Sequence, residues 1–216
     1  MKKLFIETRK KFKSSEINFS VLETLPGKSI SLAATIQYLG LLPTVKKYLE
    51  SKGKIVIVKK GAFYKGQVLG CNPLALDRTA DNLIIITDGK FHAMNNALKL
   101  KKEIFVFNTQ TLEKITKKEI EQELRKIKAK QTKFLHSSKV GIIVSTKPGQ
   151  NYRKSLDLRK KLEAINKEGF IFEIDTVNTG ELENFPDIQI WVNTACFGLA
   201  ADSSRIINLC DILEFL

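Results

Sequence analysis

The sequence is short of the residues and runs that mark several classes of protein. Three cysteines among 216 residues are too few for a disulfide scaffold, and no two of them form a Cys-x-x-Cys pair. The longest apolar runs, such as residues 83–87, are about five residues long, whereas a membrane-spanning helix needs about 20. Residues 1–12 are basic but lack the apolar core of a secretion signal. We therefore expect a cytoplasmic protein with reduced cysteines and no membrane partner.

The charge balance is strongly basic, because 36 Lys and Arg face 23 Asp and Glu, for a formal net charge of +13. Such a charge suits a nucleic-acid binder, since cationic side chains displace the counterions of phosphates. The basic residues are nevertheless spread along the chain, and no RNA-recognition, zinc-finger or helix-turn-helix signature accompanies them. We predict a solvated, lysine-rich surface without a nucleic-acid partner, and a basic nucleic-acid-binding α/β module is the alternative hypothesis.

Apolar residues recur with strand and helix periods in both halves of the chain. Strands of the buried type alternate with helices, which predicts parallel sheets covered on both faces. We predict strands over 17–22, 54–58, 83–87, 104–107, 140–144, 170–174 and 188–192, and helices over 41–52, 91–100 and 153–167. The fold class is therefore α/β, with two similar lobes, each a parallel-type sheet flanked by helices.

A long charged helix is predicted between the two halves. Thr116 and Glu119 form a capping box that opens this helix, and an apolar stripe begins at Ile120. Beyond the helix, the alternation of strands and helices starts again. We therefore predict one α/β domain over 1–133 and a second over 134–216.

Two cysteines lie in loops that follow apolar segments. Cys71 stands between a glycine and an Asn-Pro turn, and Cys196 follows the predicted strand 188–192. In open parallel sheets ligands collect beyond the carboxyl ends of the strands. A shared metal centre therefore explains these two cysteines better than a disulfide, and the alternative for Cys71 is a small buried hydrophobe. Cys210 lies in an apolar stretch, and we predict that it packs there.

Two further loops carry polar side chains after predicted strands. Residues 145–150 (Ser-Thr-Lys-Pro-Gly-Gln) offer hydroxyls, a cation and free amides that can hold a carboxylate or phosphate, although an ordinary turn has the same composition. Asp88 and His92 lie one helical turn apart, which permits acid-base chemistry, but a histidine at the start of a helix is more often a surface or capping residue. No Ser-His-Asp arrangement is visible.

Four segments together resemble a known family. Residues 67–72 (Gln-Val-Leu-Gly-Cys-Asn), 88–92 (Asp-Gly-Lys-Phe-His), 144–150 (Val-Ser-Thr-Lys-Pro-Gly-Gln) and 191–196 (Trp-Val-Asn-Thr-Ala-Cys) are similar to motifs of the radical-generating subunit of archaeal diphthamide synthase. They occur in the family's order and cover nearly the whole chain. The resemblance therefore predicts an enzyme, a 2-(3-amino-3-carboxypropyl)histidine synthase, rather than a generic α/β module.

The resemblance implies a 4Fe-4S cluster and S-adenosylmethionine as cofactors. In the family three domains each give one cysteine to the cluster, so Cys71 and Cys196 become the expected iron ligands, and the open iron holds S-adenosylmethionine. The resulting 3-amino-3-carboxypropyl radical adds to a histidine of elongation factor 2, the protein substrate. We assign no catalytic residue in this chain. The expected cofactor-binding residues are Gln67, Gly70, Asp88, Gly89, His92, Ser145, Thr146, Lys147, Gly149, Gln150 and Asn193.

The sequence departs from the family pattern in two ways. It resembles the second and third domains only, so we expect another chain to supply the first-domain cysteine, either a split-gene partner or a full-length homologue. Phe197 and Gly198 stand where the family usually has Pro-Arg. A non-catalytic accessory subunit of the synthase, without its own cluster, is therefore the alternative hypothesis.

Overall fold

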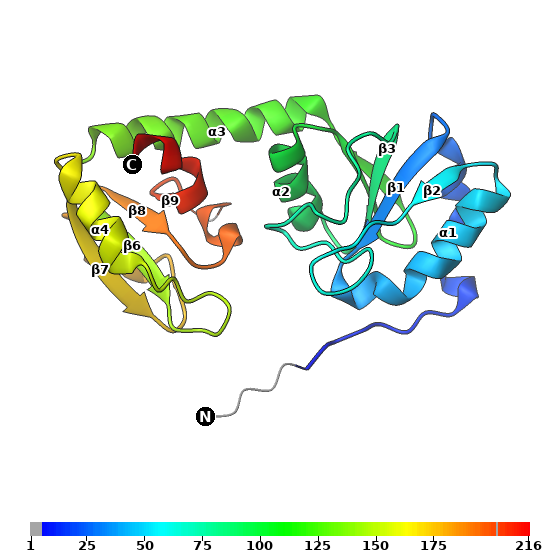
Figure 1. The fold of residues 1–216 in the computed structure, drawn as a ribbon, viewed down its shortest axis with the longest axis horizontal. Coiled ribbons are helices and arrows are strands. Elements are labelled where there is room, and N and C mark those ends of the chain that lie inside the picture. The colour runs from blue at the N-terminus through cyan, green and yellow to red at the C-terminus, as the bar shows by residue number, and fades with distance from the viewer. Residues whose placement is uncertain (1–5, 202) are drawn as a thin grey trace. The chain divides into compact units, whose positions relative to one another are not determined.

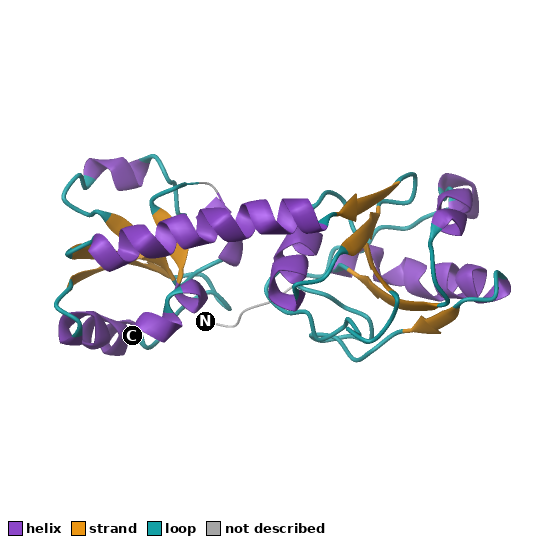
Figure 2. Cartoon of the chain, turned by 90° about the horizontal axis from the view of Figure 1, so that it is seen from above, coloured by secondary structure: helices purple, strands orange, loops and turns teal. Residues whose placement is uncertain are grey.

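The chain folds into two compact units, Met1–Gln122 (unit 1) and Glu123–Leu216 (unit 2) (Figure 1). The structure is a computed structural model, and it describes residues 6–201 and 203–216. Each unit combines helices with strands (Figure 2). In the part of the chain that is described, none of the helices combines the length and apolarity needed to cross a membrane.

Helix α3 (Lys117–His136) runs from unit 1 into unit 2. Its first turn is bonded to unit 1, because Glu119 Oε1 lies 3.3 Å from Lys90 Nζ. Its C-terminal half is bonded to unit 2, where Gln131 Nε2 donates a hydrogen bond to the Asp211 carbonyl at 2.6 Å. The boundary between the units, after Gln122, therefore lies in the first half of α3. The predicted boundary, between 133 and 134, lies in the last turn of the same helix.

Unit 1 contains a five-stranded sheet of order β2-β1-β3-β4-β5, parallel except for β5, which is antiparallel to β4. One face of the sheet packs against helix α1, because Ile30, Leu32 and Ile84 share a buried cluster with Val45 and Leu49. Its elements are β1 (Ser29–Ala34), α1 (Leu42–Ser51), β2 (Ile55–Ile57), β3 (Asn82–Ile86), α2 (Phe91–Leu100), β4 (Ile104–Phe107) and β5 (Leu112–Ile115).

Unit 2 contains a four-stranded parallel sheet of order β7-β6-β8-β9. One face packs against α3 and α4 through Phe134 and Leu162, and the other carries Trp191, which lies in a cluster with Leu182 and Ala200. Its elements are β6 (Lys139–Ser145), α4 (Ser155–Ala164), β7 (Glu168–Ile174), β8 (Ile190–Asn193) and β9 (Ile206–Asn208). The prediction of two α/β lobes with largely parallel sheets is therefore confirmed.

The strand predicted over 17–22 is wrong. Residues 19–22 belong to a 3-10 helix, Phe19–Thr24, in which Phe19 and Leu22, three residues apart, both face the core, and a second 3-10 helix, Ser14–Glu16, precedes the segment. Strands β1, β5 and β9 were not predicted. Strand β1 is made of serine, alanine and only two large aliphatic residues, so it lacks the β-branched run that marks a central strand.

Candidate metal centre

All three cysteines are free, and all three are exposed. Free cysteine is among the residues most often buried, but Cys71 is exposed, so the alternative of a small buried hydrophobe is wrong for this residue. The predicted packing of Cys210 is also wrong, because its exposed Sγ lies 3.6 Å from Asp211 Oδ1 in a short 3-10 helix, Leu209–Asp211. Each thiol is therefore accessible to a ligand or reagent.

The loop that carries Cys71 is joined to the carboxyl end of β1. The Ala34 amide donates to the Gly66 carbonyl at 2.9 Å, and the Val68 amide donates to the Ala34 carbonyl at 2.9 Å. These two bonds extend the parallel sheet by one bridge, between Ala34 and Gln67. The cysteine consequently lies four residues beyond a fixed point at the carboxyl edge of the sheet, where open sheets bind ligands.

Helix α2 fixes the backbone around Cys71. Asn96 Nδ2 donates to the Leu69 carbonyl at 2.9 Å, and Lys99 Nζ donates to the Cys71 carbonyl at 2.6 Å. Gly70 passes so close to the helix that a Cβ added to it would lie 3.0 Å from the Phe91 ring. Glycine at this position therefore lets the loop lie on the helix while the thiol of Cys71 faces solvent.

Gln67 lies inside its own loop rather than in an open site. It is 4% exposed, and its Oε1 accepts hydrogen bonds from the Phe63 amide at 3.0 Å and the Tyr64 amide at 3.1 Å. In this structure the Gln67 side chain holds the backbone of its own loop, a role that the sequence did not predict.

Asp88 follows β3 and is paired with the N-terminal segment. Lys10 Nζ lies 2.5 Å from Asp88 Oδ2 and donates a second hydrogen bond to the Tyr38 hydroxyl at 2.8 Å. The hydrogen bond from Lys10, followed by that from Tyr38, holds the pKa of the Asp88 carboxyl below its usual value. Gly89, at φ +67, makes the left-handed turn into α2. Sequence analysis missed Lys10, because 78 residues separate it from Asp88.

His92 lies in the first turn of α2, beside the Cys71 loop. Burial lowers the pKa of its imidazole, so the ring is neutral near pH 7. A Cβ added to Gly70 would lie 3.6 Å from His92 Cδ2, which places the ring against the residue before Cys71. A neutral imidazole here can accept a hydrogen bond or a proton.

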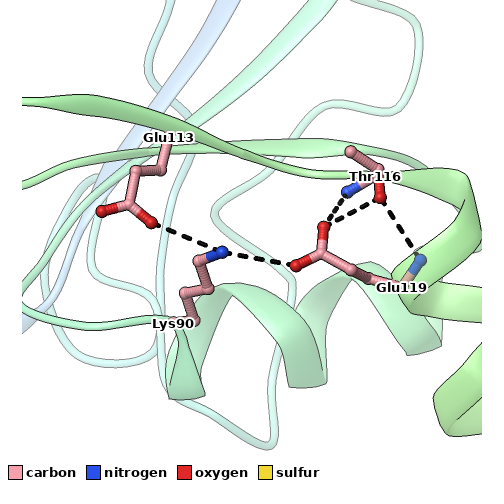
Figure 3. A network of polar contacts seen from close by, with 4 residues as sticks. All are labelled: Lys90, Glu113, Thr116 and Glu119. Carbon is pink, nitrogen blue, oxygen red and sulfur yellow. Dashed lines mark hydrogen bonds and ion pairs between the residues drawn. The ribbon is translucent and has the colours of Figure 1, made fainter.

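A polar network holds the start of α2 against the start of α3 (Figure 3). Lys90 Nζ lies 3.3 Å from Glu119 Oε1 and 3.4 Å from Glu113 Oε2. Glu119 Oε2 accepts from both the amide and the hydroxyl of Thr116 at 2.8 Å, and the Glu119 amide donates to Thr116 Oγ1 at 3.3 Å. The predicted capping box is confirmed, and it also positions the helix that carries His92.

Asn193 ends strand β8 and braces the turn that carries Cys196. Its Nδ2 donates to the Cys196 carbonyl at 2.8 Å and to Asn208 Oδ1 at 2.7 Å, while its Oδ1 accepts from the Ala195 amide at 2.9 Å. The hydroxyl of Thr194 donates to the Ile143 carbonyl at 2.7 Å. Asn193 is 3% exposed, so its amide supports the cysteine from within the core.

The loop 145–150 lies at the carboxyl end of β6 as predicted. Ser145 is buried, and its Oγ accepts from the Lys147 amide at 3.1 Å. The Thr146 hydroxyl donates to Asp175 Oδ1 at 3.1 Å, a partner at the end of β7 that sequence analysis missed. Lys147, Gly149 and Gln150 are exposed. The exposed part of the loop therefore combines a cation with a turn at Gly149 (φ +80).

Neither unit offers a complete set of metal ligands. Within residues 6–201 and 203–216, no three His, Cys, Asp or Glu side chains converge on one point. The exposed thiols of Cys71 and Cys196 are the donors that iron–sulfur clusters use. The donor type therefore fits a cluster, while the number of donors in each unit does not complete one.

Comparison with known proteins decides the family. A profile of the diphthamide synthesis protein family matches residues 1–206. The chain belongs to this family. The resemblance predicted from the four loop segments is thereby confirmed.

Curated relatives bear the name 2-(3-amino-3-carboxypropyl)histidine synthase. The protein of Pyrococcus horikoshii is 29% identical over 174 residues, which are 79% of this chain and 50% of the relative. The protein of Methanocaldococcus jannaschii is 27% identical over 190 residues, which are 86% of this chain and 49% of the relative. The chain thus spans about half the length of the curated relatives it matches.

Solved structures of the family share the fold. Dph2 from Pyrococcus horikoshii superimposes with a TM-score of 0.80 at 26% identity, over 91% of this chain and 59% of that chain. A second structure of that protein, with a 4Fe-4S cluster, gives a TM-score of 0.79 at 27% identity over the same shares. These relatives support the prediction of a synthase and of a 4Fe-4S cluster in the family.

Proposed function

We propose that the chain is part of a 2-(3-amino-3-carboxypropyl)histidine synthase that carries out the first step of diphthamide formation on elongation factor 2. Cys71 and Cys196 bind a 4Fe-4S cluster, and a third cysteine comes from another chain. The observation that carries this proposal is one exposed thiol on a braced turn in each unit, since free cysteines are ordinarily buried.

The donor chemistry supports a cluster with an open iron. Three thiolates leave one iron without a protein ligand, and that iron can bind S-adenosylmethionine. When reduced and bound, such a cluster would supply one electron to break the bond between the sulfur and the γ-carbon of S-adenosylmethionine, with a thioether as the leaving group. The task of this chain is to hold the thiolates, orient the cofactor and exclude competing reactions.

Residues of both units support the cofactor in this proposal. Lys147 and the exposed turn at Gly149 suit a carboxylate, because they offer a cation and backbone amides. The neutral ring of His92 suits a hydrogen-bond donor of the cofactor. Asp88 is already neutralised by Lys10, so it binds a cation only if Lys10 moves away.

The test is an anaerobic preparation of the chain with a family member that contains an N-terminal domain, followed by iron counting and electron paramagnetic resonance after dithionite reduction. We expect about four irons per assembly. Cys71→Ala and Cys196→Ala should each abolish or strongly reduce iron binding, whereas Cys210→Ala is the matched control and should not. A stable assembly without iron contradicts the proposal.

A second candidate function is an accessory subunit without its own cluster. It is favoured by Phe197 and Gly198, which directly follow Cys196 and begin a 3-10 helix, Phe197–Ala201, where the family pattern has Pro-Arg. This candidate predicts that Cys71→Ala and Cys196→Ala leave modification of elongation factor 2 intact in the assembly. Loss of modification in either variant excludes it.

A further inference from the structure

Residues 59–67, which we call the basic turn, form a rigid projection beside the Cys71 loop. The Gly66 amide donates to the Lys59 carbonyl at 2.7 Å, and the Ala62 amide donates to the Gln67 carbonyl at 3.1 Å. The side chain of Gln67 accepts two more amides from within the turn. A Cβ at Gly61 would approach backbone atoms of Gln67 within 3.0 Å, so the turn is closed around a glycine.

The basic turn presents an apolar side chain to solvent. Phe63 is 81% exposed, and its backbone amide is fixed by Gln67. The neighbouring Tyr64 is 40% exposed, and its ring packs against Arg9, whose guanidinium lies 4.7 Å from the ring centroid. An exposed phenylalanine whose backbone is held in a hydrogen-bonded turn suits a docking anchor, because binding then has to order its side chain but not its backbone.

Lysines surround this anchor. Lys59, Lys60 and Lys65 are all exposed, and among the residues that the structure describes no ion pair involves them within 4.0 Å. The Lys60–Lys65 bridge joins the two arms of the turn, so like charges are held close together. Such an arrangement favours an acidic counterpart.

The charge of the whole chain is concentrated in the unit that carries the basic turn. Unit 1 has 22 of the 36 basic and 11 of the 23 acidic side chains, a net charge of +11. Unit 2 has the other 14 basic and 12 acidic side chains, a net charge of +2. The positive potential that guides an acidic partner therefore originates in unit 1.

We propose that the basic turn is the docking site for the protein substrate, which presents acidic residues around an apolar hollow that receives Phe63. This inference rests on the proposed function, because the substrate must reach the metal centre. Gln67 ends the turn and Cys71 lies four residues further along the same loop, which keeps a docked protein beside the thiol. The charge of the turn selects the partner and increases the association rate, while burial of Phe63 lowers the dissociation rate of the complex.

The experiment measures binding of elongation factor 2 from the same source to the intact chain, by a titration at 50 and 300 mM NaCl. We expect Phe63→Ser to weaken binding about tenfold or more. The triple variant Lys59→Glu, Lys60→Glu and Lys65→Glu should weaken it further and flatten the salt dependence. Matched controls in unit 2 are Leu156→Ser, at a residue 62% exposed, and the triple variant Lys154→Glu, Lys160→Glu and Lys161→Glu. The controls should bind like the wild type.

The outcomes separate this inference from the proposed function. If the basic-turn variants bind elongation factor 2 as tightly as the wild type does, the proposed docking site is wrong. It is also wrong if the wild-type chain binds single-stranded RNA but not elongation factor 2. Circular dichroism verifies that each variant is folded. Iron content in the anaerobic assembly should be unchanged in the basic-turn variants, since none of the altered residues contacts Cys71 through a hydrogen bond in the described chain. An assembly that binds elongation factor 2 but contains no iron supports the accessory function. An assembly that contains iron but does not bind elongation factor 2 through the basic turn contradicts the docking site and leaves the proposed function standing.

Discussion

The two units expose a cysteine by different means. In unit 1, Cys71 lies in a long connection between β2 and β3, and side chains of helix α2, Asn96 and Lys99, hold its backbone. In unit 2, Cys196 lies three residues after Asn193, which ends β8 and bonds directly to the cysteine carbonyl. The first cysteine is positioned by a helix face, and the second is positioned by the end of a core strand.

Because the two cysteines are held in different ways, the exposure of each thiol depends on a different part of the protein. Asn193 is buried against Asn208 of β9, and Thr194 is bonded to Ile143 of β6, so the Cys196 turn shares the core of its sheet. The Cys71 loop is joined to its sheet by the bridge between Ala34 and Gln67, and nearer the cysteine its backbone is held by Asn96 and Lys99 of α2. Substitutions in the core of unit 2 should therefore alter the reactivity of Cys196, whereas substitutions at the surface of α2 should alter the reactivity of Cys71.

The largest effect is expected from Gly141→Ala in β6. A Cβ at this position would lie within 3.0 Å of the Trp191 ring, and overpacking of this kind costs about 1–3 kcal/mol. Trp191 is the single tryptophan of the chain, so its fluorescence reports unfolding of unit 2 alone. We expect a lower midpoint in a denaturant titration and faster alkylation of Cys196 by iodoacetamide.

The matched control for this change is Gly40→Ala in unit 1, where a Cβ meets no atom within 4 Å. Its tryptophan transition should coincide with that of the wild type. An unchanged Cys196 alkylation rate in a clearly destabilised Gly141→Ala protein would show that the Cys196 turn is independent of the core.

A somewhat smaller effect is expected from Asn193→Ala. The change leaves buried Asn208 without its hydrogen bond and frees the Cys196 carbonyl, and an unpaired buried polar group costs about 1–3 kcal/mol. Mass spectrometry after a short iodoacetamide pulse should show faster labelling of Cys196 and unchanged labelling of Cys71. Equal acceleration at both cysteines would contradict separate bracing of the two loops.

Asn96→Ala is the corresponding change in unit 1, and its effect on stability should be smaller, about 1 kcal/mol. The variant loses the bonds to the Leu69 and His92 carbonyls. Asn96 Oδ1 is itself buried and has no hydrogen-bond partner among the residues that the structure describes, so its removal relieves one unfavourable group. Labelling of Cys71 should accelerate while the Trp191 transition stays in place. A shift of that transition would mean that the loop contributes to unit 2 as well.

The sequence predicted the fold wherever apolar runs were long or periodic. Residues 91–100 and 104–107 agree with α2 and β4 to the residue, because an amphipathic helix and a β-branched strand have distinct periods. Strand β1 escaped prediction because Ser31, Ala33 and Ala34 have low strand propensity and are buried only through their place in the middle of the sheet. Tertiary context, rather than local preference, makes this segment a strand.

For the candidate site, the sequence predicted which residues lie at strand ends but not which residues hydrogen-bond to them. The strand-end rule brought Asp88, Ser145 and Asn193 to the carboxyl edges of their own sheets, as the structure has them. The hydrogen-bond partners of Asp88, Thr146 and Asn193 come from distant segments, one of them a strand that was not predicted. These partners are Lys10, Asp175 and Asn208. Spacing in a single sequence cannot reveal such partners, because the topology decides which strand ends become neighbours.

The smallest effect is expected from Asp88→Asn, which removes the ion pair with Lys10. The pKa of Asp88 lies below its ordinary value of 3.8, so the folded protein binds this proton more weakly than the unfolded chain. The resulting stabilisation is present above about pH 4 and is lost as the pH falls through the lower folded value. Because both side chains are about half exposed, water and salt screen the pair and the effect on the melting temperature at pH 7 should be small.

The pH dependence is the decisive property of this variant. Thermal melts followed by circular dichroism should show a small difference between wild type and Asp88→Asn at pH 7. The difference should shrink as the pH falls below about 4 and through the lowered pKa of the folded carboxyl, because the wild-type carboxyl is then protonated as well. Added NaCl should reduce the difference at pH 7. The Trp191 transition should be identical in both proteins, because Lys10, Tyr38 and Asp88 all lie in unit 1. A difference that grows on acidification would mean that Asp88 is stabilised in its protonated form, and the N-terminal segment would then not neutralise it.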